Sequence, residues 1–231
     1  ISLYLLFTKS KLKRLLDFFT DRKILFFSIV LITVITLIMY PIADSLKYQM
    51  RGSDQDNCII NGVKFMMSFS NPYKERSYFG NSCSSGFGAL LLYVPFVITG
   101  IYPLGSIFAS ISAVITIKKI SVFKHQATIF ALLIFSSVIW IELIFIGSDF
   151  NLIGCFLLIL AYGISRNALK KNYKNLIYLS ILGGLLASTR INFLIITPLI
   201  SLFIFKYWRK GAIVFFLISF TVSVLPSIVI Y

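Results

Sequence analysis

The sequence contains few charged residues, and acidic residues are especially scarce. Only 13% of its 231 residues are charged, and Asp and Glu together number 8 against 22 Lys and Arg. A soluble domain of this size needs roughly 25% charged residues to cover its surface. The low charge therefore excludes an ordinary soluble domain, and the 58% hydrophobic content predicts a protein solvated by membrane lipids.

Histidine and cysteine are also rare. The single histidine, His125, lies in a basic segment, which excludes a His-based metal site or a catalytic triad. Of the three cysteines, Cys155 lies inside an apolar run and is expected to be chemically inert. Cys58 and Cys83 share one polar segment, where their spacing permits a disulfide in an oxidising compartment but does not require one.

The net charge of +14 comes from short basic clusters and does not indicate a nucleic-acid surface. Basic clusters that alternate with apolar runs are typical of the cytoplasmic loops of membrane proteins. We therefore expect no nucleic-acid partner. The clusters occupy residues 9–23, 118–124, 166–174 and 206–210.

Apolar segments recur along the whole chain. They are continuous, whereas a membrane barrel needs alternating patterns, so they predict helices. We predict an all-α polytopic transmembrane bundle of about 7–8 spans, forming a single domain over residues 1–231. The chain opens on Ile1 and stops after an apolar run, so we expect it to be the N-terminal part of a longer protein. The eight segments are 24–42, 87–101, 104–117, 127–146, 150–165, 175–189, 191–205 and 212–230.

Loop charges predict the orientation. With the N-terminus cytoplasmic and residues 43–86 external, the inner loops carry 16 Lys and Arg and the outer loops carry 6. We expect a multi-pass protein of a prokaryotic plasma membrane. One conflict remains, because residues 87–117 must cross an odd number of times yet are divided by Tyr102-Pro103. Either one of the two runs does not cross, or residues 118–126 are external despite three lysines.

The external loop 43–86 is the one long polar segment. Within it, residues 55–69 place apolar side chains at helical spacing, which predicts an amphipathic helix along the outer membrane face. Asp54 and Asp56 stand at the start of this helix. Two carboxylates so placed can converge on a substrate hydroxyl or a divalent cation, or they can serve only as a solvated helix cap.

Two other groups of charged residues lie at the predicted outer boundary. Glu142 and Asp149 are seven residues apart near the end of one span, where they could form a second acidic cluster or simply meet water. Arg190 is the only basic residue at the outer end of the later helices. A charge at this position is either functional or an interfacial anchor.

The loop and its surroundings resemble a known family. The stretch Ser53-Asp54-Gln55-Asp56-Asn57, followed by Asn71-Pro72-Tyr73, resembles the first external loop of the polytopic glycosyltransferases of the C superfamily, which use polyprenyl-phosphate sugars. The apolar stretch 88–96, the triplet 147–149 and the stretch 183–190 look like the corresponding parts of mannosyltransferase-like members.

This resemblance implies sugar transfer on the external or lumenal face. The donor would be a polyprenyl-phosphate-linked sugar, and the acceptor a hydroxyl of a glycan, lipid or protein. By position, Asp54 would be the general base and Asp56 the second candidate. Arg190 would bind the donor phosphate, and Lys74 and Arg76 could serve the same role from the loop. A divalent metal could offset the phosphate charge.

Two other classes of function stay open at this stage. A polytopic transporter, or a lipid-linked polysaccharide polymerase or flippase, would also have many spans and few outer charges. Such proteins more often carry charge on broken helices at mid-membrane, whereas the polar groups here gather at the outer surface. An assembly subunit without activity is the third alternative.

Overall fold

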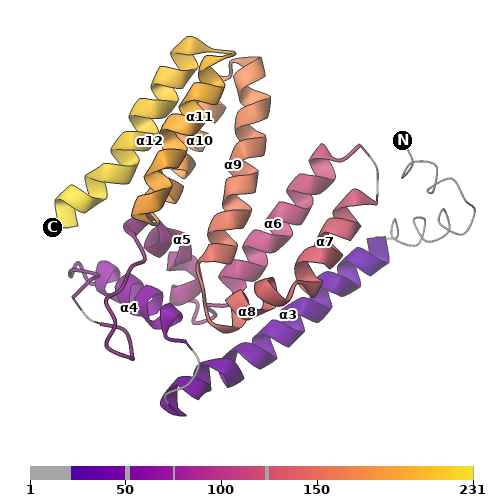
Figure 1. Ribbon diagram of the computed structural model, residues 1–231, viewed down its shortest axis with the longest axis vertical. Helices are drawn as coiled ribbons and strands as arrows, with labels where there is room; N and C mark the ends of the chain where they lie inside the picture. Colours follow the sequence, from indigo (N-terminus) through magenta and orange to yellow (C-terminus); the bar gives the residue numbers. More distant parts are fainter. Residues whose placement is uncertain (1–21, 50–52, 75, 123–124, 231) are drawn as a thin grey trace, which may run out of the picture.

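The computed structural model describes residues 22–49, 53–74, 76–122 and 125–230, and these ranges form an all-helical protein (Figure 1). The basic cluster expected at residues 9–23 lies almost entirely outside the described residues. Two short 3-10 turns, η1 (Leu46–Gln49) and η2 (Ile191–Ile195), accompany ten α-helices in the described part. These are α3 (Arg22–Ser45), α4 (Gln55–Met67), α5 (Phe87–Ile98), α6 (Leu104–Ile120), α7 (Gln126–Ser136), α8 (Val138–Phe145), α9 (Phe150–Lys170), α10 (Tyr173–Ala187), α11 (Ile196–Phe205) and α12 (Arg209–Ile230).

Three of these helices, α3, α9 and α12, are long and apolar enough to cross a membrane. The pair α7 and α8 adds a fourth candidate if it forms one span, bent by 59° at Ser137. This is fewer than the 7–8 spans predicted from hydropathy. The reason is length, since α5, α6, α10 and the η2–α11 segment contain only 12 to 17 residues, whereas a perpendicular span needs about 20.

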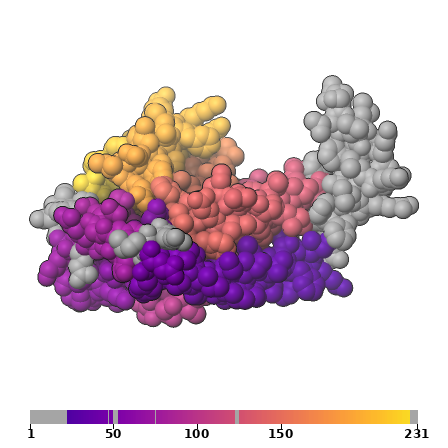
Figure 2. Space-filling view, turned by 60° about the horizontal axis from the view of Figure 1, so that its bottom comes forward, coloured from indigo at the N-terminus to yellow at the C-terminus, as the bar shows by residue number. Residues whose placement is uncertain are grey.

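Helix α3 lies along one edge of the molecule (Figure 2). Its apolar side chains are largely uncovered, with Phe26, Phe27 and Leu31 each more than 60% exposed. Soluble proteins rarely expose so continuous an apolar surface to water. The exposure therefore agrees with contact between α3 and lipid.

The links between helices gather at two opposite ends of the bundle (Figure 1). At one end, the α9–α10 and α11–α12 links meet, where the rings of Tyr173 and Trp208 lie 4.4 Å apart. At the other end lie α4, α5, and the turns that follow α8 and α10. We call these the basic end and the site end, because the described basic clusters and the predicted site residues lie at them respectively.

Helix α5 begins and ends at the site end. Just before α5, the Gly86 N–H donates to the Thr189 carbonyl, and just after it Tyr102 donates to the Gly147 carbonyl at 2.8 Å. Both ends of α5 therefore lie at the site end, so α5 runs across that end of the bundle. Helix α6 runs from there toward the opposite end (Figure 1). This geometry explains how residues 87–117 can join the two ends through α6 alone.

The predicted amphipathic helix exists as α4, which stops at Met67, two residues before the expected end. Its apolar face is covered by protein, since Ile59 and Val63 are buried in one cluster with Leu90 and Tyr93 of α5. Burying two such side chains contributes roughly 3–6 kcal/mol. The expectation that this face lies against the membrane is therefore wrong for Ile59 and Val63, because α5 takes that position.

Helices α10 and α12 approach each other very closely. A Cβ atom added to Gly184 would lie 2.6 Å from the Ser219 carbonyl oxygen and 2.7 Å from Val222 Cβ. Only glycine permits this backbone approach. The contact fixes α12 beside the site end of α10.

Candidate functional site

The two carboxylates at the start of α4 are both buried, and neither is a simple solvated cap. Asp54 occupies the N-cap position of α4, but its side chain makes no capping hydrogen bond. Its Oδ2 instead accepts from the backbone N–H of Phe79, 25 residues later, at 2.9 Å. Asp54 thus holds the returning part of the external loop against the helix that it precedes.

Asp56 is held more completely than Asp54. The Tyr40 hydroxyl, from α3, donates to Asp56 Oδ2 at 2.5 Å, and the Asn57 N–H donates to Oδ1 at 2.9 Å. The residue is 2% exposed. Both oxygens are therefore engaged within the protein, whereas Oδ1 of Asp54 receives no hydrogen bond from the residues that the structure describes.

The turn between α8 and α9 presses against Asp56. Gly147 has a φ of +68°, and a Cβ added there would lie 2.6 Å from Asp56 Cβ. The Tyr102 hydroxyl donates to the Gly147 carbonyl at 2.8 Å, and burial raises the pKa of Tyr102 well above its ordinary value. Tyr102 therefore remains a protonated donor that fixes this turn.

The same turn presents Asp149 to Arg190. Arg190 Nη2 lies 2.7 Å from Asp149 Oδ1, and the aspartate side chain is 1% exposed. The guanidinium also donates to Ser84 Oγ at 2.8 Å and lies 4.6 Å from the centre of the Phe150 ring. Asp149 Oδ2 and Arg190 Nε are both buried without a hydrogen-bond partner among the described residues. The pair is thus oriented but not saturated, and it leaves polar capacity for a ligand or for water.

Two adjoining hollows lie beside Arg190. The first is a cavity of about 390 Å³, which we call the arginine cavity; its wall includes Arg190, Ser84, Ser188, Tyr73 and Ser223. The second, the apolar groove, has a volume of about 700 Å³ and is lined largely by apolar side chains. Phe87 lines both of them. Other residues of the groove include Met66, Pro72, Leu91, Leu185, Val222 and Leu225.

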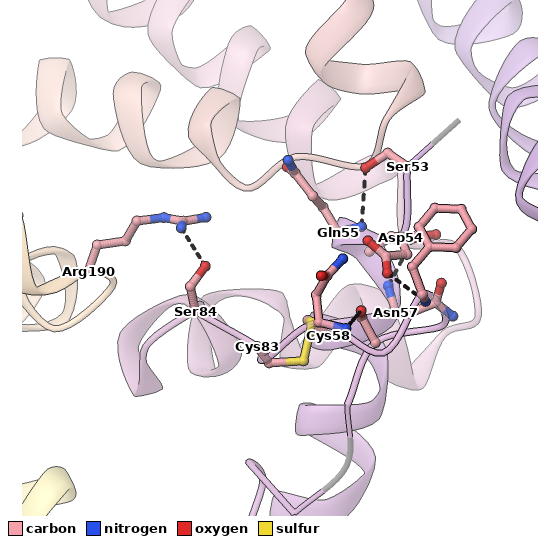
Figure 3. The surroundings of a disulfide bond; sticks show 12 residues. Ser53, Asp54, Gln55, Asn57, Cys58, Cys83, Ser84 and Arg190 are labelled. Carbon is pink, nitrogen blue, oxygen red and sulfur yellow. Dashed lines mark hydrogen bonds between the residues drawn. A yellow bond between two sulfur atoms is a disulfide. The ribbon is translucent and has the colours of Figure 1, made fainter. Parts of the chain in front are cut away.

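Cys58 and Cys83 form a disulfide in this structure. The bond joins α4 to the residue just before Ser84, and Figure 3 shows the two cysteines between Arg190 and the carboxylate of Asp54. Cys83 and Ser84 both belong to the wall of the arginine cavity. The disulfide therefore connects the acidic start of α4 to the arginine cavity.

Of the other predicted residues, Asp149 pairs with Arg190, whereas Lys74, Arg76 and Glu142 do not line the arginine cavity. Lys74 is exposed, and Arg76 is exposed and donates to the Gly80 carbonyl, so neither lines the arginine cavity. Glu142 is exposed on α8, while Asp149 is buried beyond the Gly147 turn. The Glu142–Asp149 cluster stays a prediction; Glu142 lies within α8, and Asp149 is the N-cap of α9.

The structure also adds residues that the sequence reasoning missed. Tyr40, Tyr102 and Ser84 hold Asp56, the Gly147 turn and Arg190 respectively. Only Tyr40 carried a sequence signal, as the single tyrosine of α3 at its predicted outer end. Within the described ranges, no three His, Cys, Asp or Glu side chains are close enough together to hold a metal ion.

Comparisons with models of protein families, with curated proteins and with solved structures find no match to this chain.

Proposed function

We propose that this protein is a membrane glycosyltransferase that moves a sugar from a polyprenyl-phosphate donor to an acceptor hydroxyl. The observation that carries the proposal is the composition of the site end. There, three features lie within one connected structure: the buried Asp54 carboxylate, of which one oxygen accepts no hydrogen bond from the described residues, an oriented arginine, and an apolar groove. An amphipathic lipid phosphate has chemistry that matches the last two of these features.

The donor would occupy the two hollows together. Its phosphate would lie in the arginine cavity, where Arg190 carries a positive charge held by Asp149 and Ser84. Its isoprenoid chain would lie in the apolar groove and pass Phe87, which borders both spaces. A groove of about 700 Å³ has room for several isoprene units of such a chain.

Asp54 is the preferred general base. It would accept the proton of the acceptor hydroxyl while the hydroxyl oxygen attacks the anomeric carbon. The bond between that carbon and the phosphate oxygen breaks, and the lipid phosphate leaves with the bonding electron pair and its added negative charge. Arg190 would stabilise that charge. Asp56, whose oxygens are engaged by Tyr40 and Asn57, would orient the start of α4.

The reaction would take place on the external face. In this arrangement α3, α6, the α7–α8 pair, α9, α10, η2–α11 and α12 would make seven crossings, with the shorter helices in a locally thinned bilayer. Helices α4 and α5 would lie at the outer surface. The basic end would face the cytoplasm, in agreement with the positive-inside rule.

The test compares three aspartate and glutamate variants of the full-length protein in membranes. Transfer would be measured from radiolabelled polyprenyl-phosphate sugars. Asp54→Asn should lower the rate by about 10²–10⁴-fold, because it removes the base, and Asp56→Asn should lower it less. Glu142→Gln, at an exposed carboxylate outside the site, is the matched control and should retain full activity.

Wild-type protein that transfers no sugar from any donor tested, or an Asp54→Asn variant with wild-type rate, would contradict the proposal. The transporter, polymerase or flippase alternative would then be the stronger one.

A further inference from the structure

The disulfide Cys58–Cys83 stands at the junction between the two halves of the site. Cys58 lies one turn after Asp54, in the first part of α4. Cys83 directly precedes Ser84, whose hydroxyl accepts the hydrogen bond from Arg190 Nη1 at 2.8 Å. One covalent bond thus connects the segment that carries the proposed base to the segment that orients the proposed phosphate ligand.

The part of the loop between Phe79 and Gly86 has few other attachments to the helices. Its described residues include no helix or strand, and Ser84 itself is exposed. Hydrogen bonds fix it at Phe79, which binds Asp54, and at Gly86, which binds the Thr189 carbonyl. Between these two points, the disulfide is the only covalent attachment of the described loop to the helices. Without it, Ser84 would gain conformational freedom at the point where it contacts Arg190.

We propose that the Cys58–Cys83 disulfide positions Ser84 against Arg190, so that phosphate binding in the arginine cavity depends on the oxidised form. The proposal rests on the proposed function to the extent that the cavity binds a lipid phosphate. Both cysteines are half-buried, so a small dithiol can reach them. Dithiothreitol would supply two electrons and two protons to the bond, yielding two thiols and its own cyclic disulfide.

The first experiment measures binding of undecaprenyl phosphate to the full-length protein in nanodiscs. Reduction, or the double change Cys58→Ser and Cys83→Ser, should weaken binding about threefold to tenfold relative to the oxidised protein. Dithiothreitol should have no further effect on the double variant. Cys155→Ser removes the buried free cysteine of α9 and is the matched control, which should bind and respond to reduction as wild type does.

A second measurement separates positioning from general stability. Ser84→Ala should weaken binding about threefold to tenfold in the oxidised protein, and should have almost no effect once the disulfide is absent. Such non-additivity is expected only if the disulfide acts through Ser84. Equal losses from Ser84→Ala in both backgrounds would overturn the proposal, as would wild-type affinity in the protein that lacks the disulfide.

Hydrogen exchange provides a readout that does not need the lipid. Reduction should speed exchange of the backbone amides in residues 83–86 and 188–190, and leave the basic end unchanged. If wild-type protein binds no lipid phosphate, the proposed function fails, but the exchange data still decide the positioning role. Unchanged exchange after complete reduction would overturn that role, whether or not lipid binds.

Discussion

The two ends of the bundle treat charge in opposite ways. At the basic end the described lysines and arginines are exposed, so each is solvated and costs little. At the site end, Asp54, Asp56 and Asp149 are buried, and each is held by a specific partner far away in the sequence. Buried charge is expensive unless it is paired. Charge at the basic end can therefore serve orientation in the membrane, while charge at the site end requires a precise tertiary structure.

The largest effect is expected from a change in the turn at Gly147, which packs against Asp56 and precedes Asp149. Gly147→Ala would strain a φ of +68° and drive a Cβ to within 2.6 Å of Asp56 Cβ. We expect a loss of about 3–5 kcal/mol in unfolding free energy, together with loss of activity. The measurement is thermal unfolding in detergent.

Gly100→Ala is the matched control for that change. Gly100 also has a positive φ, +73°, but a Cβ there would meet nothing within 4 Å. It should cost only about 1–2 kcal/mol, from the backbone conformation alone. Equal losses for the two glycine variants would show that the contact with Asp56 is unimportant.

A second change compares the two ends directly. Asp149→Ala would leave Arg190 beside a buried void without its ion-pair partner, at an expected cost of about 2–4 kcal/mol. Lys170→Ala, at the exposed basic end, should change stability by no more than about 0.5 kcal/mol. Unfolding of both variants in the same detergent provides the comparison, and similar effects would remove the distinction between the ends.

The smallest expected effect concerns substrate preference. Leu91→Trp would partly fill the apolar groove without touching the arginine cavity. We expect KM for a long-chain polyprenyl donor to rise about threefold to tenfold, with little change for a short-chain donor. Leu133→Trp, at a residue 65% exposed on α7, is the control. A similar rise in KM for both donors would argue against the groove as the chain site.

Local patterns were sufficient to predict much of the fold. The continuous apolar runs predicted helices, and the spacing over residues 55–69 predicted α4 to within two residues of its end. Hydropathy reports which solvent a segment prefers, but it does not report whether the segment crosses or returns. The position of both ends of α5 at the site end depends on contacts of Gly86 with Thr189 and of Tyr102 with Gly147. Such long-range contacts have no local signature.

The candidate site also contains residues that the sequence predicted and residues that it did not. Asp54, Asp56 and Arg190 stood out because charge is rare in this chain and theirs falls at the predicted outer boundary. The expected Glu142–Asp149 cluster assumed one continuous helix, which the left-handed turn at Gly147 interrupts. Tyr40 and Ser84 were missed because their roles come from partners 16 and 106 residues away.

The close contact of α10 and α12 has a consequence for the apolar groove. Two residues that line the groove lie beside Gly184: Leu185 follows it in the sequence, and Val222 lies against it from α12. At Gly184 the two helices touch without an intervening side chain. No chain of carbon atoms can pass between backbones at that distance. The groove therefore has a closed wall there, and the lipid tail of the proposed donor would have to run along that wall. Gly184 thus sets the shape of the groove, although it has no side chain of its own to line it.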